Sequence, residues 1–315
     1  GVHVDGKLRA WLLSFSPVTL TSAFSSVTLG AALAWYDTGR LNLMLYLVTL
    51  GGLLAAQAGV NLIHDYHDYR TGVDQLYRSS GFSHRLHPIL DLGLSPSSVV
   101  AVGYALIAAA LGAAAYLALA VGIPILVLGA TGLFLGAAYS VPPLKLHYRG
   151  LGELVAALAM GPLVVWGSYA VQVGSLSRVY PLLVGTPNGT FTFLTLMGTG
   201  MLEVEASRAV GKRTVALLLG ARRVGYVALA AVAVIYASLA ASALLGYLPL
   251  ISLVSLALLP WTLRLVGPLL SGSEEEVRRR WRELRRLWAG HFSVRLVLLA
   301  VLLASMVAAR VVGIP

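Results

Sequence analysis

The sequence predicts an all-α, polytopic integral membrane protein, and three observations carry that prediction. Of its 315 residues, 58% are hydrophobic and only 11% are charged. The mean hydropathy is +0.81, and the apolar residues gather in runs long enough to cross a bilayer. A chain of this composition has lipid as its main solvent. No stretch resembles a separate soluble domain, so residues 1–315 are expected to form a single transmembrane domain.

About nine apolar segments have the length that a membrane-spanning helix needs, which is about 20 residues. The first follows Lys7 and Arg9 and is not followed by a small-residue cleavage site, so it is expected to be a retained span rather than a signal peptide. In chain order the segments are 17–36, 42–64, 97–120, 122–140, 152–173, 187–206, 223–245, 247–268 and 291–311.

The basic residues predict how the chain is oriented in the cell membrane. Most of the 23 Lys and Arg residues lie in the N-terminal tail and in the loops after the second, fourth, sixth and eighth segments, whereas the opposite side holds only Arg40, Arg178 and Arg310. This asymmetry predicts a cytoplasmic N-terminus and an external C-terminus. The net charge of +10 is therefore an orientation signal and not the footprint of a nucleic-acid partner. Because the chain has no cysteine, disulfides and thiolate metal sites are excluded.

The longest polar stretch is a basic cytoplasmic segment at 272–290. Three consecutive acids at 274–276 precede three consecutive arginines at 278–280. Opposite charges three and four residues apart suit a helix on the cytoplasmic membrane face, with Trp281 and Trp288 as interfacial anchors. A solvated loop that only sets the orientation is the competing interpretation.

Carboxylates are concentrated in one stretch, residues 61–74, at the end of the second apolar segment. Asp65 and Asp68 share one helix face, with Asn61 one turn earlier, and Asp74 follows a Gly-Val turn. Carboxylates at a membrane helix end are costly unless a cation pairs with them. Oxygen ligands favour Mg²⁺, which suggests a phosphate-bearing substrate.

Further polar residues follow in the cytoplasmic loops at about 65–96, 139–153 and 203–222. The histidines at 64, 67, 84 and 87 are expected to be hydrogen-bonded rather than metal-bound. Arg85 is a candidate for a substrate phosphate or carboxylate, against a purely topogenic role. Tyr139 either lines a cavity, where its ring would stabilise a cation, or belongs to an interfacial aromatic belt.

Three ordered motifs resemble the UbiA superfamily of intramembrane prenyltransferases. They are Asn-Leu-x-x-Asp-Tyr-x-Asp-x-x-x-Gly-x-Asp at 61–74, Tyr-Ser-x-Pro-Pro with Arg-Gly-Leu-Gly-Glu at 139–153, and Gly-Lys-Arg-Thr at 211–214. The first is most like the branch that prenylates 1,4-dihydroxy-2-naphthoate for menaquinone. The similarity runs over most of the chain.

The resemblance implies helices around a central cavity in which two Mg²⁺ ions bridge the acidic motifs and an isoprenyl diphosphate. Ionisation of the diphosphate would leave an allylic carbocation that an aromatic acceptor attacks through carbon. No nucleic acid and no obligatory protein partner are expected. The implied catalytic residues are Asp65, Asp68, Tyr139 and Lys145; the substrate-binding residues are Asn61, Arg70, Arg78, Arg85, Arg149, Lys212 and Arg213; and the metal ligands are Asn61, Asp65, Asp68, Asp74, Glu203 and Ser207.

The second acidic motif departs from the usual Asn-x-x-Arg-Asp-x-x-x-Asp. Glu203 stands at the first Asp, Ser207 at the second and Leu202 at the Arg. Glu203 can still bind Mg²⁺, but the Ser207 hydroxyl weakens the site. Glu205 should point away from Glu203, because residues two apart do not share a helix face.

The altered motif leaves several functions open. One is a degenerate homologue that binds a prenyl lipid or quinone without turnover. Within the enzymes, 4-hydroxybenzoate, geranylgeranylglyceryl phosphate, a chlorophyllide or haem are rival acceptors. An ion-coupled transporter is disfavoured, because its acids would lie near the bilayer midplane.

Overall fold

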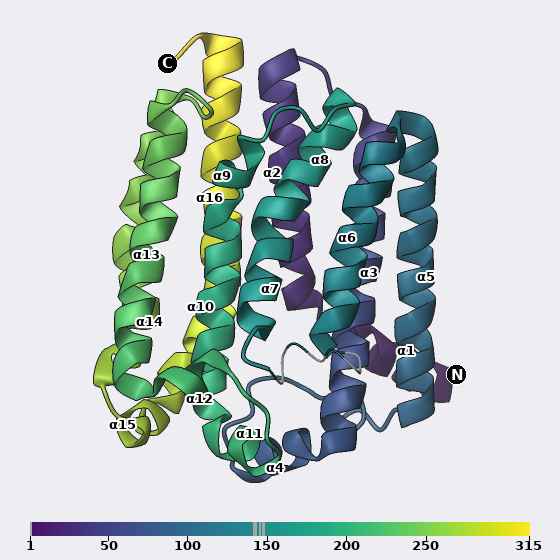
Figure 1. The fold of residues 1–315 in the computed structure, drawn as a ribbon, viewed down its shortest axis with the longest axis vertical. Helices are drawn as coiled ribbons and strands as arrows, with labels where there is room; N and C mark the ends of the chain where they lie inside the picture. The colour runs from purple at the N-terminus through teal and green to yellow at the C-terminus, as the bar shows by residue number, and fades with distance from the viewer. Residues whose placement is uncertain (1, 141–143, 145, 147–148) are drawn as a thin grey trace.

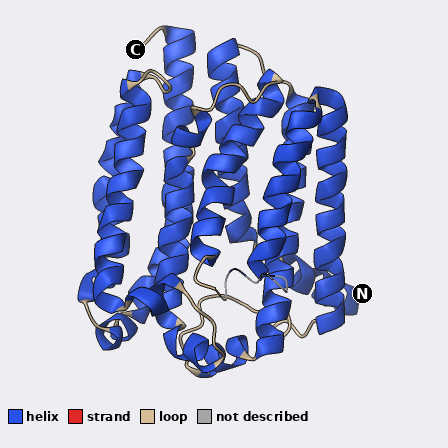
Figure 2. Cartoon of the chain, in the orientation of Figure 1, coloured by secondary structure: helices blue, strands red, loops and turns tan. Residues whose placement is uncertain are grey.

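A computed structural model describes residues 2–140, 144, 146 and 149–315, and within these ranges every regular element is a helix (Figure 2). The elements before residue 150 are α1 (Val2–Ser14), α2 (Pro17–Thr38), α3 (Leu43–Thr71), α4 (Val73–Ser79), α5 (Pro96–Val121) and α6 (Ile123–Ser140). Those that follow are α7 (Gly152–Leu158), α8 (Val164–Val173), α9 (Pro181–Val184), α10 (Thr186–Leu202), α11 (Val204–Ala209), α12 (Val215–Leu219), α13 (Ala221–Leu244), α14 (Leu259–Val266), α15 (Glu274–Arg279) and α16 (Trp281–Val307).

The long helices stand side by side in a bundle, with the two chain ends at opposite ends of it (Figure 1). Among the described residues, seven helical stretches are long and apolar enough to cross a membrane: Pro17–Thr38, Leu43–Thr71, Pro96–Val121, Gly152–Val173, Ala221–Leu244, Leu250–Ser271 and Trp281–Val312. Helices α6 and α10 stand beside them, with 18 and 17 residues. The all-α membrane fold is confirmed, and the count of nine spans stays a prediction.

Two spans extend further toward the loop end of the bundle than their apolar residues predict. Helix α3 runs to Thr71 instead of residue 64, because its last turns bury Asp65 and Asp68 inside the protein, where polar side chains find partners. It ends at Gly72, whose φ of 83° suits a glycine after a helix. Helix α16 begins at Trp281, ten residues before the predicted start of the last span.

The expected helix at 272–290 is divided between two helices, and the expectation that Trp288 anchors it at the membrane interface is wrong. Only α15 is a separate short helix, and from Trp281 onward the chain already belongs to α16. Trp288 faces inward: its ring lies 5.0 Å from that of His84 and 5.4 Å from that of Phe292.

The span Gly152–Val173 is interrupted where it passes close to α10. A π-helical turn at Ala159–Leu163, which contains Pro162, joins α7 to α8. Within this turn Gly161 lies against Gly189 of α10, so closely that a Cβ on Gly161 would come within 2.2 Å of the Gly189 nitrogen. A Cβ on Gly189 would in turn come within 2.2 Å of the Ala157 carbonyl of α7, so the span and α10 pack backbone to backbone.

The short helices α4, α11, α12 and α15 gather at the end of the bundle where α3 and α10 terminate (Figure 1). Helix α11 packs against α4, and α12 packs between α10 and α13. This end of the bundle therefore brings together the loops after α3, α6 and α10, in which the polar motifs lie.

Candidate functional site

Two adjoining chambers lie inside the bundle. A polar chamber of about 190 Å³ occupies the end near α4 and α11, and an apolar chamber of about 330 Å³ continues from it between α3, α5, α6, α8 and α10. Both chambers are lined by Thr19, Val60, Asn61, Tyr139, Leu196 and Trp288. These shared residues form the junction between a site for a charged group and a site for a hydrocarbon chain.

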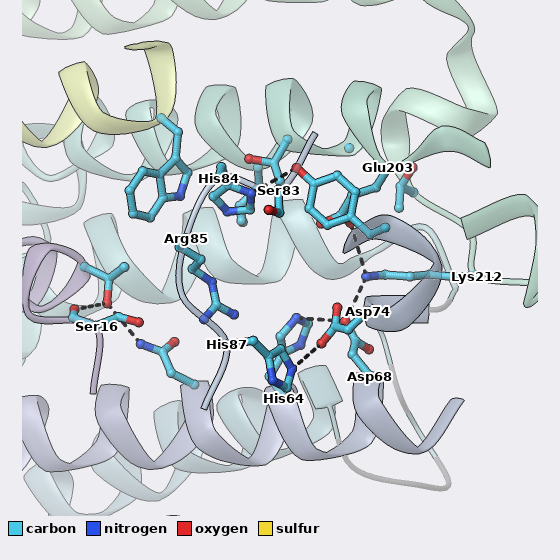
Figure 3. A pocket seen from close by; sticks show the side chains of 18 of the residues that line it. Ser16, His64, Asp68, Asp74, Ser83, His84, Arg85, His87, Glu203 and Lys212 are labelled. Atoms are coloured by element: carbon cyan, nitrogen blue, oxygen red, sulfur yellow. Dashed lines mark hydrogen bonds and ion pairs between the residues drawn. The ribbon is translucent and has the colours of Figure 1, made fainter. Parts of the chain in front are cut away.

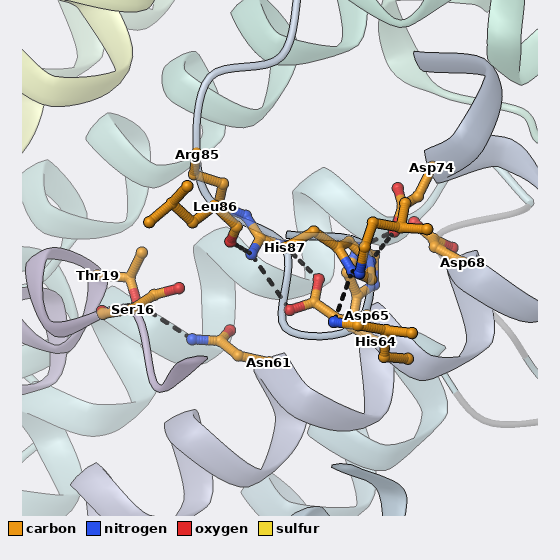
Figure 4. Close-up of polar contacts among 12 residues, drawn as sticks. Ser16, Thr19, Asn61, His64, Asp65, Asp68, Asp74, Arg85, Leu86 and His87 are labelled. Atoms are coloured by element: carbon orange, nitrogen blue, oxygen red, sulfur yellow. Dashed lines mark hydrogen bonds and ion pairs between the residues drawn. The ribbon is translucent and has the colours of Figure 1, made fainter. Parts of the chain in front are cut away.

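The carboxylates of α3 are buried and paired with bases (Figure 4). Asp65 is fully buried, and the Arg85 guanidinium donates hydrogen bonds to both of its carboxylate oxygens, with Nη1 3.2 Å from Oδ2. Asp68 Oδ2 lies 3.2 Å from His64 Nε2 and 3.2 Å from Lys212 Nζ. Buried carboxylates require such partners, because an unpaired charge in the interior is strongly unfavourable.

Asp74, at the start of α4, receives a hydrogen bond from His87, whose Nε2 lies 2.7 Å from Asp74 Oδ2. The backbone N–H groups of Ile89 and Leu90 donate to His87 Nδ1, at 3.2 Å each. Nδ1 is thus an acceptor, so the proton belongs on Nε2. The ligand atoms of Asp65, Asp74 and His87 lie within 4.8 Å of one another. This tautomer nevertheless makes His87 a support for Asp74 rather than a metal ligand, as in other sites where a second residue orients a ligating carboxylate.

Glu203 stands where α10 ends and α11 begins, which points its side chain into the polar chamber (Figure 3). Lys212 Nζ lies 3.7 Å from Glu203 Oε2, and through its pair with Asp68 it also links the third motif to the first. The pKa of the Glu203 carboxyl is raised to about 7, chiefly by burial and also by the nearby Asp74 and Asp68, against the opposing effect of Lys212 and Arg85. Burial likewise raises the pKa of Asp74, against the hydrogen bond from His87.

Ser207 and Glu205 have separate surroundings. Ser207 is fully buried, and within the described part of the chain its Oγ has no hydrogen-bond partner. Glu205 pairs with Arg278 at the surface, where 62% of its side chain is exposed. The prediction that Glu205 points away from Glu203 is therefore confirmed.

Of the other predicted site residues, some line the chambers and some lie away from them. Arg78, which also pairs with Asp91, lines the polar chamber. Tyr139 stands at the junction, its ring 5.2 Å from that of His64. Three predicted substrate-binding residues, Arg70, Arg149 and Arg213, are exposed and do not line either chamber, and Lys145 lies outside the described residues.

Several chamber residues were not predicted. Glu153 is buried and accepts a hydrogen bond from the Val215 backbone at 3.2 Å, although its place in the Arg-Gly-Leu-Gly-Glu motif was a usable signal. Tyr77 is hydrogen-bonded to His84 at 3.1 Å. Burial, helped by Arg85 and Arg285, lowers the pKa of His84 to about 3, so this imidazole is neutral. The position of Trp288 depends on the packing of α16, which no local pattern reveals.

The donor set of the polar chamber suits a hard divalent cation. Asp68, Asp74 and Glu203 line it, with Asp65 directly behind Arg85. Carboxylate oxygens are the ligands that Mg²⁺ prefers, and the imidazoles nearby are engaged in hydrogen bonds.

Several proteins resemble this chain in sequence. A 2-carboxy-1,4-naphthoquinone phytyltransferase of Synechocystis is 29% identical over 262 residues, 82% of this chain and 81% of that protein. A 1,4-dihydroxy-2-naphthoate octaprenyltransferase of Bacillus subtilis is 27% identical over 210 residues, 67% of this chain and 65% of that protein. The UbiA prenyltransferase domain-containing protein 1 of Mus musculus is 30% identical over 216 residues, 68% of this chain and 62% of that protein.

Solved structures share the fold. The apo structure of a UbiA homologue from Aeropyrum pernix K1 superposes with a TM-score of 0.63 at 18% identity, over 89% of this chain and 97% of that one. A UbiA homologue from Archaeoglobus fulgidus bound to GPP and Mg²⁺ gives 0.61 at 16% identity, over 91% of this chain and 99% of that one. The sequence profile of the UbiA prenyltransferase family matches residues 23–290. The chain with its paired chambers is thus a multi-pass membrane protein that belongs to the UbiA prenyltransferase family.

Proposed function

We propose that this protein transfers a prenyl group from an isoprenyl diphosphate to 1,4-dihydroxy-2-naphthoate, in an Mg²⁺-dependent reaction at the polar end of the bundle. The observation that carries the proposal is the junction: a chamber of carboxylates and bases adjoins an apolar chamber, and six residues line both. A molecule with a charged head and a hydrocarbon chain fits both chambers at once.

The residues present suggest how the head group is held. Asp68, Asp74 and Glu203 would hold the cation, with His87 orienting Asp74. A bound Mg²⁺ would supply the positive charge that makes diphosphate a leaving group. Arg85 and Lys212, which already reach into the chamber, would bind the phosphate oxygens.

The junction residues act on the other end of the reacting bond. Tyr139 and Trp288 present aromatic faces where the first carbons of the chain would lie, and such faces stabilise developing positive charge. The apolar walls exclude water, which would otherwise capture the carbocation. The acceptor would then form its new bond through a ring carbon and lose its carboxyl group.

The choice of acceptor is supported by the 61–74 motif and by two relatives named for naphthoquinone and dihydroxynaphthoate substrates. The proposed orientation places the polar chamber at the cytoplasmic face, since the loops around it carry most of the basic residues.

A second candidate function is binding of a prenyl lipid or quinone without turnover. It is favoured by one observation: Ser207, where the family usually has a carboxylate, offers the site only a buried neutral hydroxyl.

The deciding experiment is a prenyl-transfer assay with the purified protein in lipid. Geranylgeranyl diphosphate is offered with dihydroxynaphthoate and, separately, with 4-hydroxybenzoate and geranylgeranylglyceryl phosphate, with and without Mg²⁺, and products are identified by mass. We expect a decarboxylated prenyl naphthoquinol only when Mg²⁺ is present. If product forms only with another acceptor, that compound would replace dihydroxynaphthoate as the proposed acceptor. Mg²⁺-dependent diphosphate binding without any product would establish the binding function instead.

A further inference from the structure

Arg295, in the membrane-spanning part of α16, is a buried cation without a counterion. Only 1% of it is exposed, and no carboxylate pairs with it among the described residues. Its Nη1 donates to Ser22 Oγ and to Thr192 Oγ1, at 3.0 Å each, and its Nε and Nη2 have no partner in the described structure. Burial of a guanidinium against hydroxyls alone is unfavourable, so an anion bound next to Arg295 would be stabilised by its charge.

The guanidinium stands directly behind the wall of the apolar chamber. Ser22 and Thr192, its two acceptors, both line that chamber. On α16, Trp288 and His291 line it as well, and they precede Arg295 by seven and four residues, which places all three on one helix face. An anion inside the chamber at Ser22 would therefore lie one hydrogen bond away from a full positive charge.

Ser22 is positioned to donate into the chamber. Its oxygen already accepts from Arg295, whereas the described residues offer no acceptor for its proton. Thr192 differs, since its hydroxyl donates to the Asn188 carbonyl at 3.3 Å. The Ser22 hydroxyl can therefore donate a hydrogen bond to a ligand next to the Arg295 guanidinium.

Gln57 of α3 presents the complementary group. Its Nε2 donates to the Thr19 carbonyl at 2.8 Å, which fixes the amide orientation and leaves Oε1 as the free end. That oxygen is buried and has no partner in the described structure, and Gln57 lines the same chamber. Thr19 lies one helical turn before Ser22 on α2, so the acceptor and the donor are neighbours next to the junction.

We propose that Ser22 and Gln57, with Arg295 behind Ser22 as positioning residue, form the acceptor subsite for a hydroxylated aromatic carboxylate. The carboxylate accepts from Ser22 opposite the Arg295 charge, the ring hydroxyl donates to Gln57, and the ring lies against Trp288 at the junction. This inference rests on the proposed function, and it names the residues that would select an acidic acceptor.

The test is a binding measurement that requires neither Mg²⁺ nor diphosphate. Isothermal titration of the full chain in nanodiscs compares 1-hydroxy-2-naphthoate with its neutral carboxamide. The unsubstituted protein should prefer the acid by about tenfold or more, as expected for a charge-assisted hydrogen bond. Arg295→Gln should abolish this preference while amide binding persists, Arg295→Lys should retain most of it, and Ser22→Ala should weaken acid binding alone.

Two comparisons complete the test. Gln57→Leu should remove the preference for 1-hydroxy-2-naphthoate over 2-naphthoate, which lacks the hydroxyl. Arg264→Gln is the matched control, because Arg264 is an exposed arginine on α14 and lines neither chamber. It should bind both ligands as the unsubstituted protein does.

The possible outcomes test the subsite and the proposed function independently of each other. Equal loss of acid and amide binding in Arg295→Gln, or no loss of either, would overturn the subsite. If Arg295→Gln does not fold, the same comparison of acid with amide in Ser22→Ala decides. Prenyl transfer that is unchanged in Arg295→Gln would rule out the subsite and leave the proposed function standing. Charge-selective binding by a protein that shows no prenyl transfer would support the subsite and rule out the proposed function.

Discussion

Asp68 connects the first and third motifs of the polar chamber. Its Oδ2 is shared by His64 and Lys212, and Lys212 also approaches Glu203. The Asp68 carboxylate thus neutralises Lys212 from another loop. In the proposed reaction Lys212 turns to the phosphate, and Asp68 then binds the cation. Substitution here should act on chemistry more than on folding, because the side chain faces a polar cavity and Lys212 keeps Glu203 as a partner.

Asp68→Ala should lower prenyl transfer by about 100-fold or more, the scale seen when a group that stabilises developing charge is removed. Transfer and thermal unfolding in detergent are measured together. Asp37→Asn is the control, since Asp37 accepts from Tyr169 at 2.7 Å, away from both chambers. Unchanged turnover in Asp68→Ala would remove Asp68 from the diphosphate site.

His87→Ala should weaken Mg²⁺ binding by about 10- to 100-fold, as is typical when a residue that orients a ligating side chain is lost. The reason is that Asp74 would lose the donor that holds its Oδ2. Mg²⁺ titration of diphosphate binding measures the effect. Complete loss of binding that excess Mg²⁺ cannot restore would instead indicate that His87 is itself a ligand.

The raised pKa of Glu203 predicts opposite pH dependences for folding and for metal binding. Between pH 4.5 and about 7 the folded chain keeps a proton on this carboxyl that the unfolded chain has released. Without metal, the free energy of unfolding therefore falls as the pH rises through this window. Mg²⁺ needs the ionised carboxylate, so its affinity should fall by about tenfold per pH unit below 7.

Titration of Mg²⁺ at about pH 6 and about pH 8 would measure this slope. Glu203→Gln should bind Mg²⁺ more weakly at both values and with a shallower dependence on pH. A slope that Glu203→Gln leaves unchanged would assign the proton to another group, with Asp74 the next candidate because its pKa is also raised.

The broken span is the element on which the shape of the apolar chamber depends. The π-helical turn and Pro162 interrupt the span where Gly161 and Gly189 bring it against α10, and Ala159, Met160 and Leu163 of the same turn line the apolar chamber. Close backbone packing of this kind tolerates no side chain, so the two glycines fix the distance between two cavity walls.

Gly161→Ala should destabilise the protein by about 1–3 kcal/mol, the usual cost of overpacking. Thermal unfolding in detergent measures it. Gly112→Ala on α5 is the matched control, because a Cβ there meets nothing within 4 Å, and alanine favours helix. An equal melting temperature for the two variants would show that the α7–α10 contact can relax.

At the level of the whole molecule, the fold and the acidic site could be predicted for different reasons. Hydropathy finds spans because each is a local run, and residues 61–74 bring three acids together on one helix end and its turn. Trp288, Gln57 and Arg295 were missed because their roles arise from contacts between α2, α3, α10 and α16, which are far apart in sequence. The chain shows such long-range pairings only once it is folded.

The distribution of basic residues predicts how the whole bundle is oriented in the membrane. The two termini lie at opposite ends of the bundle (Figure 1), and the basic loops surround the polar chamber. Reporter fusions at each terminus, expressed in cells, should therefore show a cytoplasmic N-terminus and an external C-terminus. The reverse result would place the polar chamber on the outer face.

The ion pairs of the polar chamber impose electroneutrality on what can enter it. Asp65 with Arg85 and Asp68 with Lys212 already balance their charges. A divalent cation arriving alone would be balanced only after Asp74 and Glu203, whose pKa values are raised, lose their protons, and a diphosphate arriving alone would leave excess negative charge in a poorly screened interior. Joint entry lets the cation and the diphosphate offset each other directly, so each should raise the affinity of the other by the same factor. A resting protein that is internally neutral thus admits its metal and its substrate as a pair.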